Sequence, residues 1–173
     1  MALKHKIQLI RDARPIVYKY NTFVRSFTLL LLFLIFFYGL YILVNKVNAD
    51  TPMFAKLLPL AISFIALDNI FRKLTSLNKV IFEEDYLKLS FLAKRAIIIP
   101  YDEIISMDLK KKISMYFTIV YNDAAGNKQY YTTPASFPHI LEIIVNIADL
   151  ATQAVVPENM KTLLDYLKAN TDV

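Results

Sequence analysis

Residues 27–44 of the chain read FTLLLLFLIFFYGLYILV, and no charged residue occurs between Arg25 and Lys46. An apolar run of this length is sufficient, as a helix, to cross the roughly 30 Å hydrocarbon core of a bilayer. A buried core helix would need more surrounding protein than a chain of 173 residues offers. Residues 47–49 satisfy the small-residue rule for signal-peptide cleavage, but the segment before the run is too long for a signal peptide and Lys46 interrupts the approach. We therefore predict a transmembrane helix over residues 26–45.

A second, weaker apolar segment covers residues 52–71. Lys56 near its start can extend to the interface, and Asp68 near its end lies one helical turn before Arg72. Asp68 allows two interpretations: an ion pair with Arg72 at the membrane surface, which we favour, or an intramembrane proton or ion site. Because the connection between the segments is short, we predict an antiparallel transmembrane hairpin over residues 26–71.

The net charge of +5 is concentrated at the N-terminus, since residues 1–25 contain six Lys or Arg and one acidic residue. From Arg72 onward the basic and acidic residues balance. Basic residues thus precede the first predicted span and follow the second. By the positive-inside rule, this distribution places both termini in the cytoplasm. A nucleic-acid-binding protein would instead carry its excess charge on the folded domain.

Few features of the chain suggest catalysis. Cysteine is absent, and the histidines, His5 and His139, have no metal-ligand partner at helical spacing. Gly39 and Gly126 are the only glycines, so a glycine-rich phosphate-binding loop is excluded. We predict no catalytic, metal or cofactor site, no small-molecule substrate and no nucleic-acid partner, and we classify the protein as a non-enzyme.

Hydrophobicity after the hairpin changes to the alternation typical of strands. Strands are predicted over residues 79–82, 86–91, 96–99, 104–109, 113–121 and 128–133, with a tight hairpin turn over 123–127. A helix follows after Pro138, capped by Ser136, and an amphipathic helix starts at Pro157. The expected organisation is a basic cytoplasmic segment (1–25), the hairpin (26–71), a helical linker (72–78), a β domain with a capping helix (79–153) and a C-terminal amphipathic helix (154–173).

The β domain resembles the bacterial pleckstrin-homology-like (PH-like) domains of small membrane proteins. The resemblance rests on YLKLS at residues 86–90 and AIIIPYDEII at residues 96–105, in which a strand, a turn and a second strand ending in Ile-Pro lead through a polar step into the next strand. It covers residues 79–153, and implies an α+β domain: a partly open, bent antiparallel barrel capped by a C-terminal helix, which binds rather than catalyses. It also implies a location in the bacterial cytoplasmic (inner) membrane.

Two sets of basic residues are candidates for contact with anionic lipid headgroups. The first set flanks the predicted spans, and its members are Arg11, Arg14, Lys19, Arg25, Arg72 and Lys73. The second is the tight connection Lys110, Lys111 and Lys112, for which a solvated turn whose cations discourage edge aggregation is the favoured alternative. Membrane lipids are thus the first predicted partner.

The last helix has an apolar stripe that must be covered, formed by Met160, Leu163, Leu164 and Leu167. The stripe either folds back on its own domain or forms an assembly face. From the second interpretation we predict a membrane-anchored binding or scaffold module that assembles with itself or with a partner membrane protein. The alternative function is a small subunit of a transport or lipid-handling complex, in which the hairpin or the basic surface contacts lipid.

Overall fold

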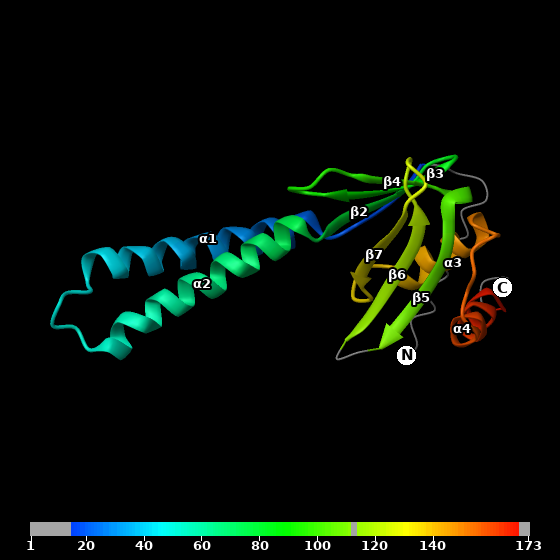
Figure 1. Cartoon of the computed structure of the whole chain (residues 1–173). Helices are drawn as coiled ribbons and strands as arrows, with labels where there is room; N and C mark the ends of the chain where they lie inside the picture. The colour runs from blue at the N-terminus through cyan, green and yellow to red at the C-terminus, as the bar shows by residue number, and fades with distance from the viewer. Residues whose placement is uncertain (1–14, 112–113, 170–173) are drawn as a thin grey trace. The chain divides into compact units, whose positions relative to one another are not determined.

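The computed structural model describes residues 15–111 and 114–169 (Figure 1). Two long helices, two antiparallel sheets and two further helices make up this part of the chain. In chain order they are β1 (Ile16–Lys19), α1 (Thr22–Asn45), α2 (Met53–Thr75), β2 (Leu77–Phe82), β3 (Tyr86–Phe91), β4 (Ile97–Pro100), the 3-10 turn η1 (Tyr101–Glu103), β5 (Ile104–Lys111), β6 (Met115–Asn122), β7 (Lys128–Pro134), α3 (Ile140–Leu150) and α4 (Glu158–Ala169).

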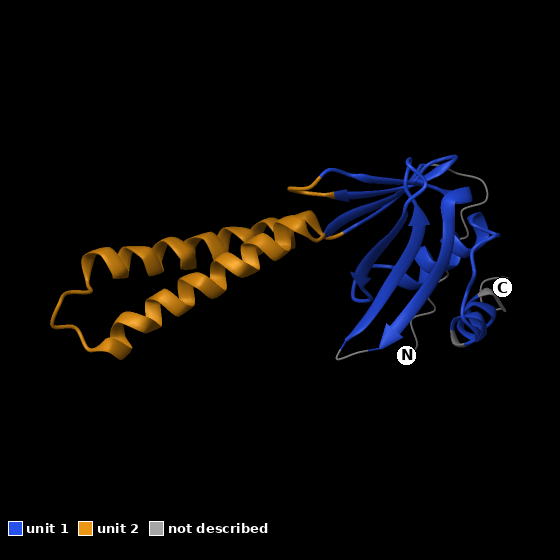
Figure 2. Cartoon of the chain, in the orientation of Figure 1, with its two compact units in different colours: residues 1–19, 77–90, 95–173 blue, residues 20–76, 91–94 orange. Residues whose placement is uncertain are grey.

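The chain forms two compact units, coloured separately in Figure 2. Among the described residues, the helical unit contains residues 20–76 and the short segment 91–94, and the sheet unit contains residues 15–19, 77–90, 95–111 and 114–169. The α1–α2 hairpin is therefore an insertion between β1 and β2, and these two strands pair with each other.

The predicted basic segment over residues 1–25 differs from the structure at residues 16–19, which form strand β1 of the sheet unit. Their register with β2 runs from Ile16 opposite Phe82 to Lys19 opposite Lys79. Tyr18 points into the core and is 7% exposed. Strand β2 also begins earlier than expected, at Leu77, so the predicted helical linker over 72–78 is divided between the end of α2 and β2.

The strands form two open sheets, of order β1-β2-β3-β4 and β5-β6-β7. The six predicted strands are present as β2 to β7, β3 with the predicted bounds and the others with shifted ends, and the α+β class is confirmed. In place of the expected partly open, bent barrel, the described strands form two open sheets. The 3-10 turn over Tyr101–Glu103 separates β4 from β5 and ends the first sheet. The backbone of β5 instead pairs on its outer side with Val155, whose N–H donates to the carbonyl of Ile105 at 2.8 Å.

The core of the sheet unit lies between the two sheets and α3. The inward face of α3 is buried, with Ile144 and Ile147 at 0% exposure. Phe117 on β6 is 1% exposed, whereas Met115, which alternates with it on the same side of the strand, is 46% exposed at the start of β6. Burial of apolar side chains from both sheets and α3 is the main stabilising contribution to this unit.

The predicted hairpin turn between β6 and β7 is confirmed. Asp123 Oδ1 accepts hydrogen bonds from the backbone N–H groups of Ala125 and Asn127, each at 2.9 Å. These bonds hold the pKa of the Asp123 carboxyl below its usual value, the largest effect coming from Asn127. Gly126 has a φ of +77°, a conformation that favours glycine.

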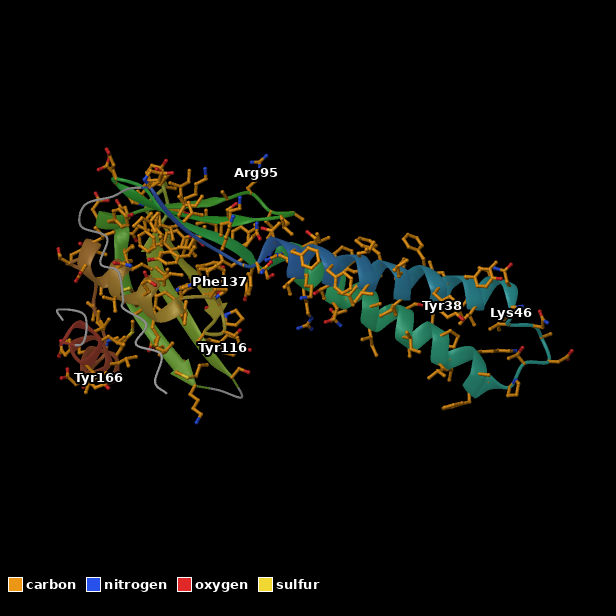
Figure 3. The ribbon with its side chains drawn as sticks, turned by 180° about the vertical axis from the view of Figure 1, so that it is seen from behind. Tyr38, Lys46, Arg95, Tyr116, Phe137 and Tyr166 are labelled. Carbon is orange, nitrogen blue, oxygen red and sulfur yellow. The ribbon has the colours of Figure 1, made fainter. Side chains whose placement is uncertain are left out.

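Both helices of the hairpin are long and apolar enough to cross a membrane. Their apolar side chains project outward along both helices (Figure 3), and Gly39 is the only buried residue of α1. A soluble protein would cover such a surface with other elements, so this exposure is compatible with insertion into lipid.

The two long helices lie close together at Gly39. A Cβ added there would lie 2.1 Å from Ser63 Oγ and 3.3 Å from the carbonyl oxygen of Pro59 on α2. Small residues at such crossings allow apolar helices to pack by van der Waals contact where the hydrophobic effect is weak. The Ser63 hydroxyl is buried and has no hydrogen-bond partner among the described residues.

We expect Gly39→Ala to destabilise the hairpin by about 1–3 kcal/mol, because the added methyl group overpacks the crossing. Ser63→Gly removes the clashing hydroxyl and should restore most of this loss in the double variant. Unfolding of the full chain in detergent would measure the coupling in a double-mutant cycle. Independent, additive effects of the two substitutions would contradict the close approach.

Candidate functional site

A polar cluster, buried at Tyr18 and Asn146 and exposed at His139, connects β1 to α3. The Tyr18 hydroxyl donates to Glu142 Oε1 at 2.8 Å, and Asn146 Nδ2 donates to the Tyr18 hydroxyl at 3.3 Å. His139 Nδ1 lies 3.2 Å from Glu142 Oε2, and the Tyr18 and Phe82 rings pack edge to face with 5.9 Å between their centroids. The four polar residues thus form one chain of hydrogen bonds.

His139 begins α3 in a left-handed conformation, with a φ of 57° and a ψ of 28°. The predicted cap, Ser136, is wrong: the cap residue is His139, whose side chain does not cap the helix. A left-handed non-glycine residue costs on the order of 1–2 kcal/mol. The contacts of the His139 ring with Glu142 and with the Tyr18 ring, 5.8 Å away, help to hold it there.

The polar cluster is better suited to joining elements than to catalysis. A Tyr-Glu-His chain can in principle hold or pass a proton. However, Tyr18 and Asn146 are 7% and 1% exposed, so a reactant has no direct access to the centre of the cluster. Burial, reinforced by the hydrogen bond to Glu142, raises the pKa of the Tyr18 hydroxyl above its usual range and keeps it protonated.

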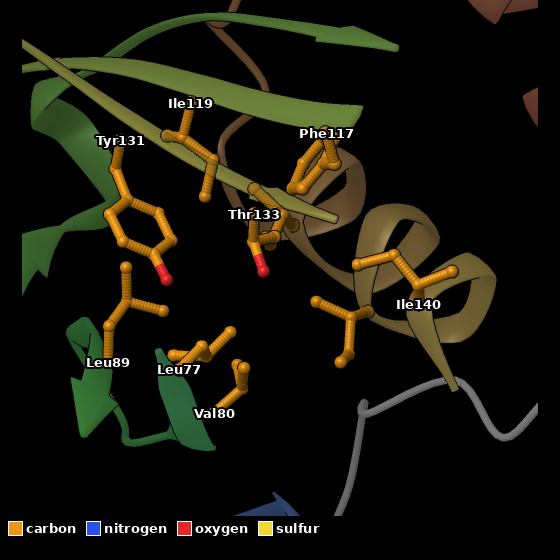
Figure 4. Close-up of a pocket in the computed structure, with 10 residues that line it drawn as sticks. Leu77, Val80, Leu89, Phe117, Ile119, Tyr131, Thr133 and Ile140 are labelled. Carbon is orange, nitrogen blue, oxygen red and sulfur yellow. The ribbon is translucent and has the colours of Figure 1, made fainter. Parts of the chain in front are cut away.

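A small cavity lies in the core of the sheet unit, with a volume of about 10 Å³ (Figure 4). It is lined by side chains from both sheets and α3: Leu77, Val80, Leu89, Phe117, Ile119, Tyr131, Thr133, Ile140, Ile143 and Ile147. A volume of about 10–15 Å³ accommodates a single water molecule. This cavity is therefore a packing gap and not a ligand site.

The outer face of β6 and β7 carries tyrosine and threonine side chains that are half-buried or exposed. We define the β6–β7 face as Tyr116, Thr118, Tyr130 and Thr132. Thr118 pairs with Thr132 across the strands, with 3.0 Å between their hydroxyl oxygens. Tyr130 is 67% exposed, and the ammonium group of Lys128 lies 5.8 Å from its ring centroid.

The basic residues proposed for lipid contact differ in their surroundings. Arg25 Nη2 donates to the carbonyl of Lys73 and, at 3.3 Å, to the carbonyl of Ser76, so its guanidinium group caps the end of α2. Arg72 Nε donates to Asp68 Oδ2 at 2.7 Å, which confirms the predicted ion pair. Lys19 is exposed and lies opposite Lys79.

In the second basic set, Lys110 forms an ion pair with Asp108 at 3.0 Å, and Lys111 is exposed at the end of β5. Arg11, Arg14 and Lys112 lie outside the described residues. Contact of either set with lipid therefore stays a prediction.

The apolar stripe of α4 is largely covered by its own chain. Met160 is 1% and Leu164 is 6% exposed, while Leu163 and Leu167 are half-buried. Of the two interpretations of the stripe, this burial favours the helix that folds back. An assembly face made of all four side chains would require α4 to leave the sheet unit.

Within residues 15–111 and 114–169, no group of three or more His, Asp or Glu side chains is arranged to hold a metal ion. The polar cluster was missed at the sequence level, because Tyr18 and Glu142 are 124 positions apart and neither belongs to a local motif.

No protein-family model matches the chain, and no similar protein is found among curated sequences.

Tyr18→Phe should destabilise the sheet unit by about 1–3 kcal/mol, because Glu142 and the buried Asn146 lose their hydrogen bonds to the Tyr18 hydroxyl. The raised pKa predicts a further difference in alkali. Above about pH 10 an unfolded tyrosine releases its proton while folded Tyr18 retains it, so stability falls as the pH rises.

The Tyr18→Phe variant should lose this part of the alkaline decline while remaining less stable at neutral pH. Thermal unfolding of the full chain in detergent at neutral pH and above about pH 10 measures both effects. Tyr86→Phe, at a half-buried strand position, is the matched control. Equal stability of wild type and Tyr18→Phe at neutral pH would show that the cluster contributes little.

Proposed function

We propose that the protein is a membrane-anchored, non-enzymatic binding module. In this proposal α1 and α2 cross the bacterial cytoplasmic membrane with both termini in the cytoplasm. The sheet unit, as a PH-like domain, mediates assembly with a second copy or with a partner membrane protein at the membrane surface.

The β6–β7 face is the observation that carries the proposal. It presents two tyrosines beside paired threonines, and Tyr130 is two-thirds exposed. Tyrosine is enriched at the centres of protein interfaces, since its ring covers a large area at a low cost in side-chain entropy while its hydroxyl can hydrogen-bond.

The position of β7 supports the same face. The outer side of β5 bonds to Val155, whereas β7 is the edge strand at the opposite side of the sheet. Edge strands are natural templates for pairing with another chain. Because α4 packs its stripe on its own chain, β6 and β7 provide a better-supported assembly surface than the last helix.

A transport role has less support. Asp68 is the only acidic residue within the two long helices, and its carboxylate is paired with Arg72. This pairing favours a structural role for Asp68 over a proton or ion site.

We expect the full chain, solubilised from native membranes in a mild detergent, to form a particle above the mass of its monomer. Tyr130→Ala should weaken this assembly by roughly thirtyfold if Tyr130 is an interface hot spot. Tyr166→Ala is the matched control, because Tyr166 on α4 is 68% exposed against 67% for Tyr130. Light scattering after size-exclusion chromatography, together with mass spectrometry of co-purifying proteins, provides the measurement.

A monodisperse monomer without partners in several mild detergents would contradict the assembly proposal. If the Tyr130→Ala variant assembles as well as the wild type, the protein still assembles, but the β6–β7 face is not the surface through which it does so.

A further inference from the structure

The loop between β3 and β4 is bonded to the end of α2. The backbone N–H of Ala93 donates to the carbonyl of Leu74 at 3.0 Å. Residues 91–94, which comprise the last residue of β3 and the start of the loop, accordingly belong to the helical unit, although the rest of β3 and all of β4 belong to the sheet unit (Figure 2). The loop is therefore held at the turn where the apolar helix ends.

The side chains of this loop have the composition of a membrane-interface segment. Leu92 is 48% exposed, and Lys94 is also exposed. On α2, three residues before Leu74, Phe71 is 58% exposed. Apolar side chains thus lie beside a cation, as in segments that enter the boundary between headgroups and acyl chains.

The charge at this end of the helical unit is positive. Asp50 lies in the connection at the opposite end of the hairpin, and Asp68 is paired with Arg72. The remaining charged side chains of this end are those of Arg25, Lys73 and Lys94, all basic. An anionic surface complements this balance.

We propose that loop 91–94 is a membrane-interface anchor, in which Leu92 inserts at the level of the acyl-chain boundary and Lys94 contacts the phosphates of anionic lipids. The proposal rests on the proposed insertion of α1 and α2, because the loop reaches lipid only if the end of α2 lies at the membrane surface. Lipid is favoured over a partner protein because the loop is bonded to the same apolar helix that would enter the bilayer.

The absence of cysteine allows a clean test with single labels. A nitroxide would be placed at Leu92→Cys in the full chain, reconstituted in phosphatidylcholine vesicles with and without phosphatidylglycerol. Collision rates with oxygen, which partitions into lipid, and with a water-soluble nickel complex then report the depth of the label. A label at Leu34→Cys in α1 is the control for a position in the hydrocarbon core. A label at Ala124→Cys in the exposed β6–β7 turn is the control for a turn that lies in water.

The label at Leu92 should favour oxygen over nickel in anionic vesicles, unlike the label at Ala124. Lys94→Gln should lower the ratio of inserted to exposed loop by roughly fivefold, the effect of one basic residue near an anionic surface. Lys128→Gln, the same change on β7, should leave the ratio unchanged.

Exposure of Leu92 to the nickel complex in both lipid mixtures, while Leu34 stays in hydrocarbon, would overturn the loop anchor and leave the transmembrane hairpin intact. Shielding of Leu92 from both reagents would overturn it in favour of a protein contact. Exposure of Leu34 to water would instead reject the membrane insertion on which the anchor rests.

Discussion

The pairing of β1 with β2 is the constraint on which the rest of the structure depends. These strands are separated by residues 20–76, yet they match residue for residue from Ile16 to Lys19. Closing a flexible loop of this length would cost conformational entropy. The antiparallel packing of α1 on α2 offsets this cost, because it brings the start of α1 and the end of α2 close together. The start of α1 and the end of α2 must consequently lie on the same side of any membrane.

The two compact units contribute differently to the proposed function. The helical unit exposes apolar side chains that only lipid or another protein can cover, and it is held together by the contact at Gly39 and by Arg25 at the end of α2. The sheet unit has a largely apolar core, at the edge of which Tyr18 joins β1 to α3. Short covalent connections on both sides of the hairpin tie the sheet unit to the helices, which supports a role in binding at a membrane surface.

Hydrophobicity patterns along the sequence predicted most of the helices and strands. The features that were not predicted, β1 and the polar cluster, depend on contacts between distant parts of the chain. The charge-free run after Arg25 and the alternation around Leu87 and Leu89 identify elements by their own sequence. Strand β1 lacked such a signal, because four residues in a basic segment become a strand only through β2. The polar cluster was equally invisible, since Tyr18 meets Glu142 only in the folded chain. The α4 stripe showed correctly that Met160 and Leu164 need cover, but a stripe does not specify whether its own chain or another provides it.

The most direct test of this account is a disulfide between β1 and β2. Val17 and Ile81 lie opposite each other, and the chain has no other cysteine to compete. Oxidation of the Val17→Cys, Ile81→Cys variant in membranes, followed by cleavage within the α1–α2 connection, should leave the two fragments joined until reduction. Val17→Cys with Asp85→Cys, placed in the turn after β2, should not form the bond efficiently. Fragments that separate without reductant in the first variant would contradict the insertion of the helical hairpin between paired strands.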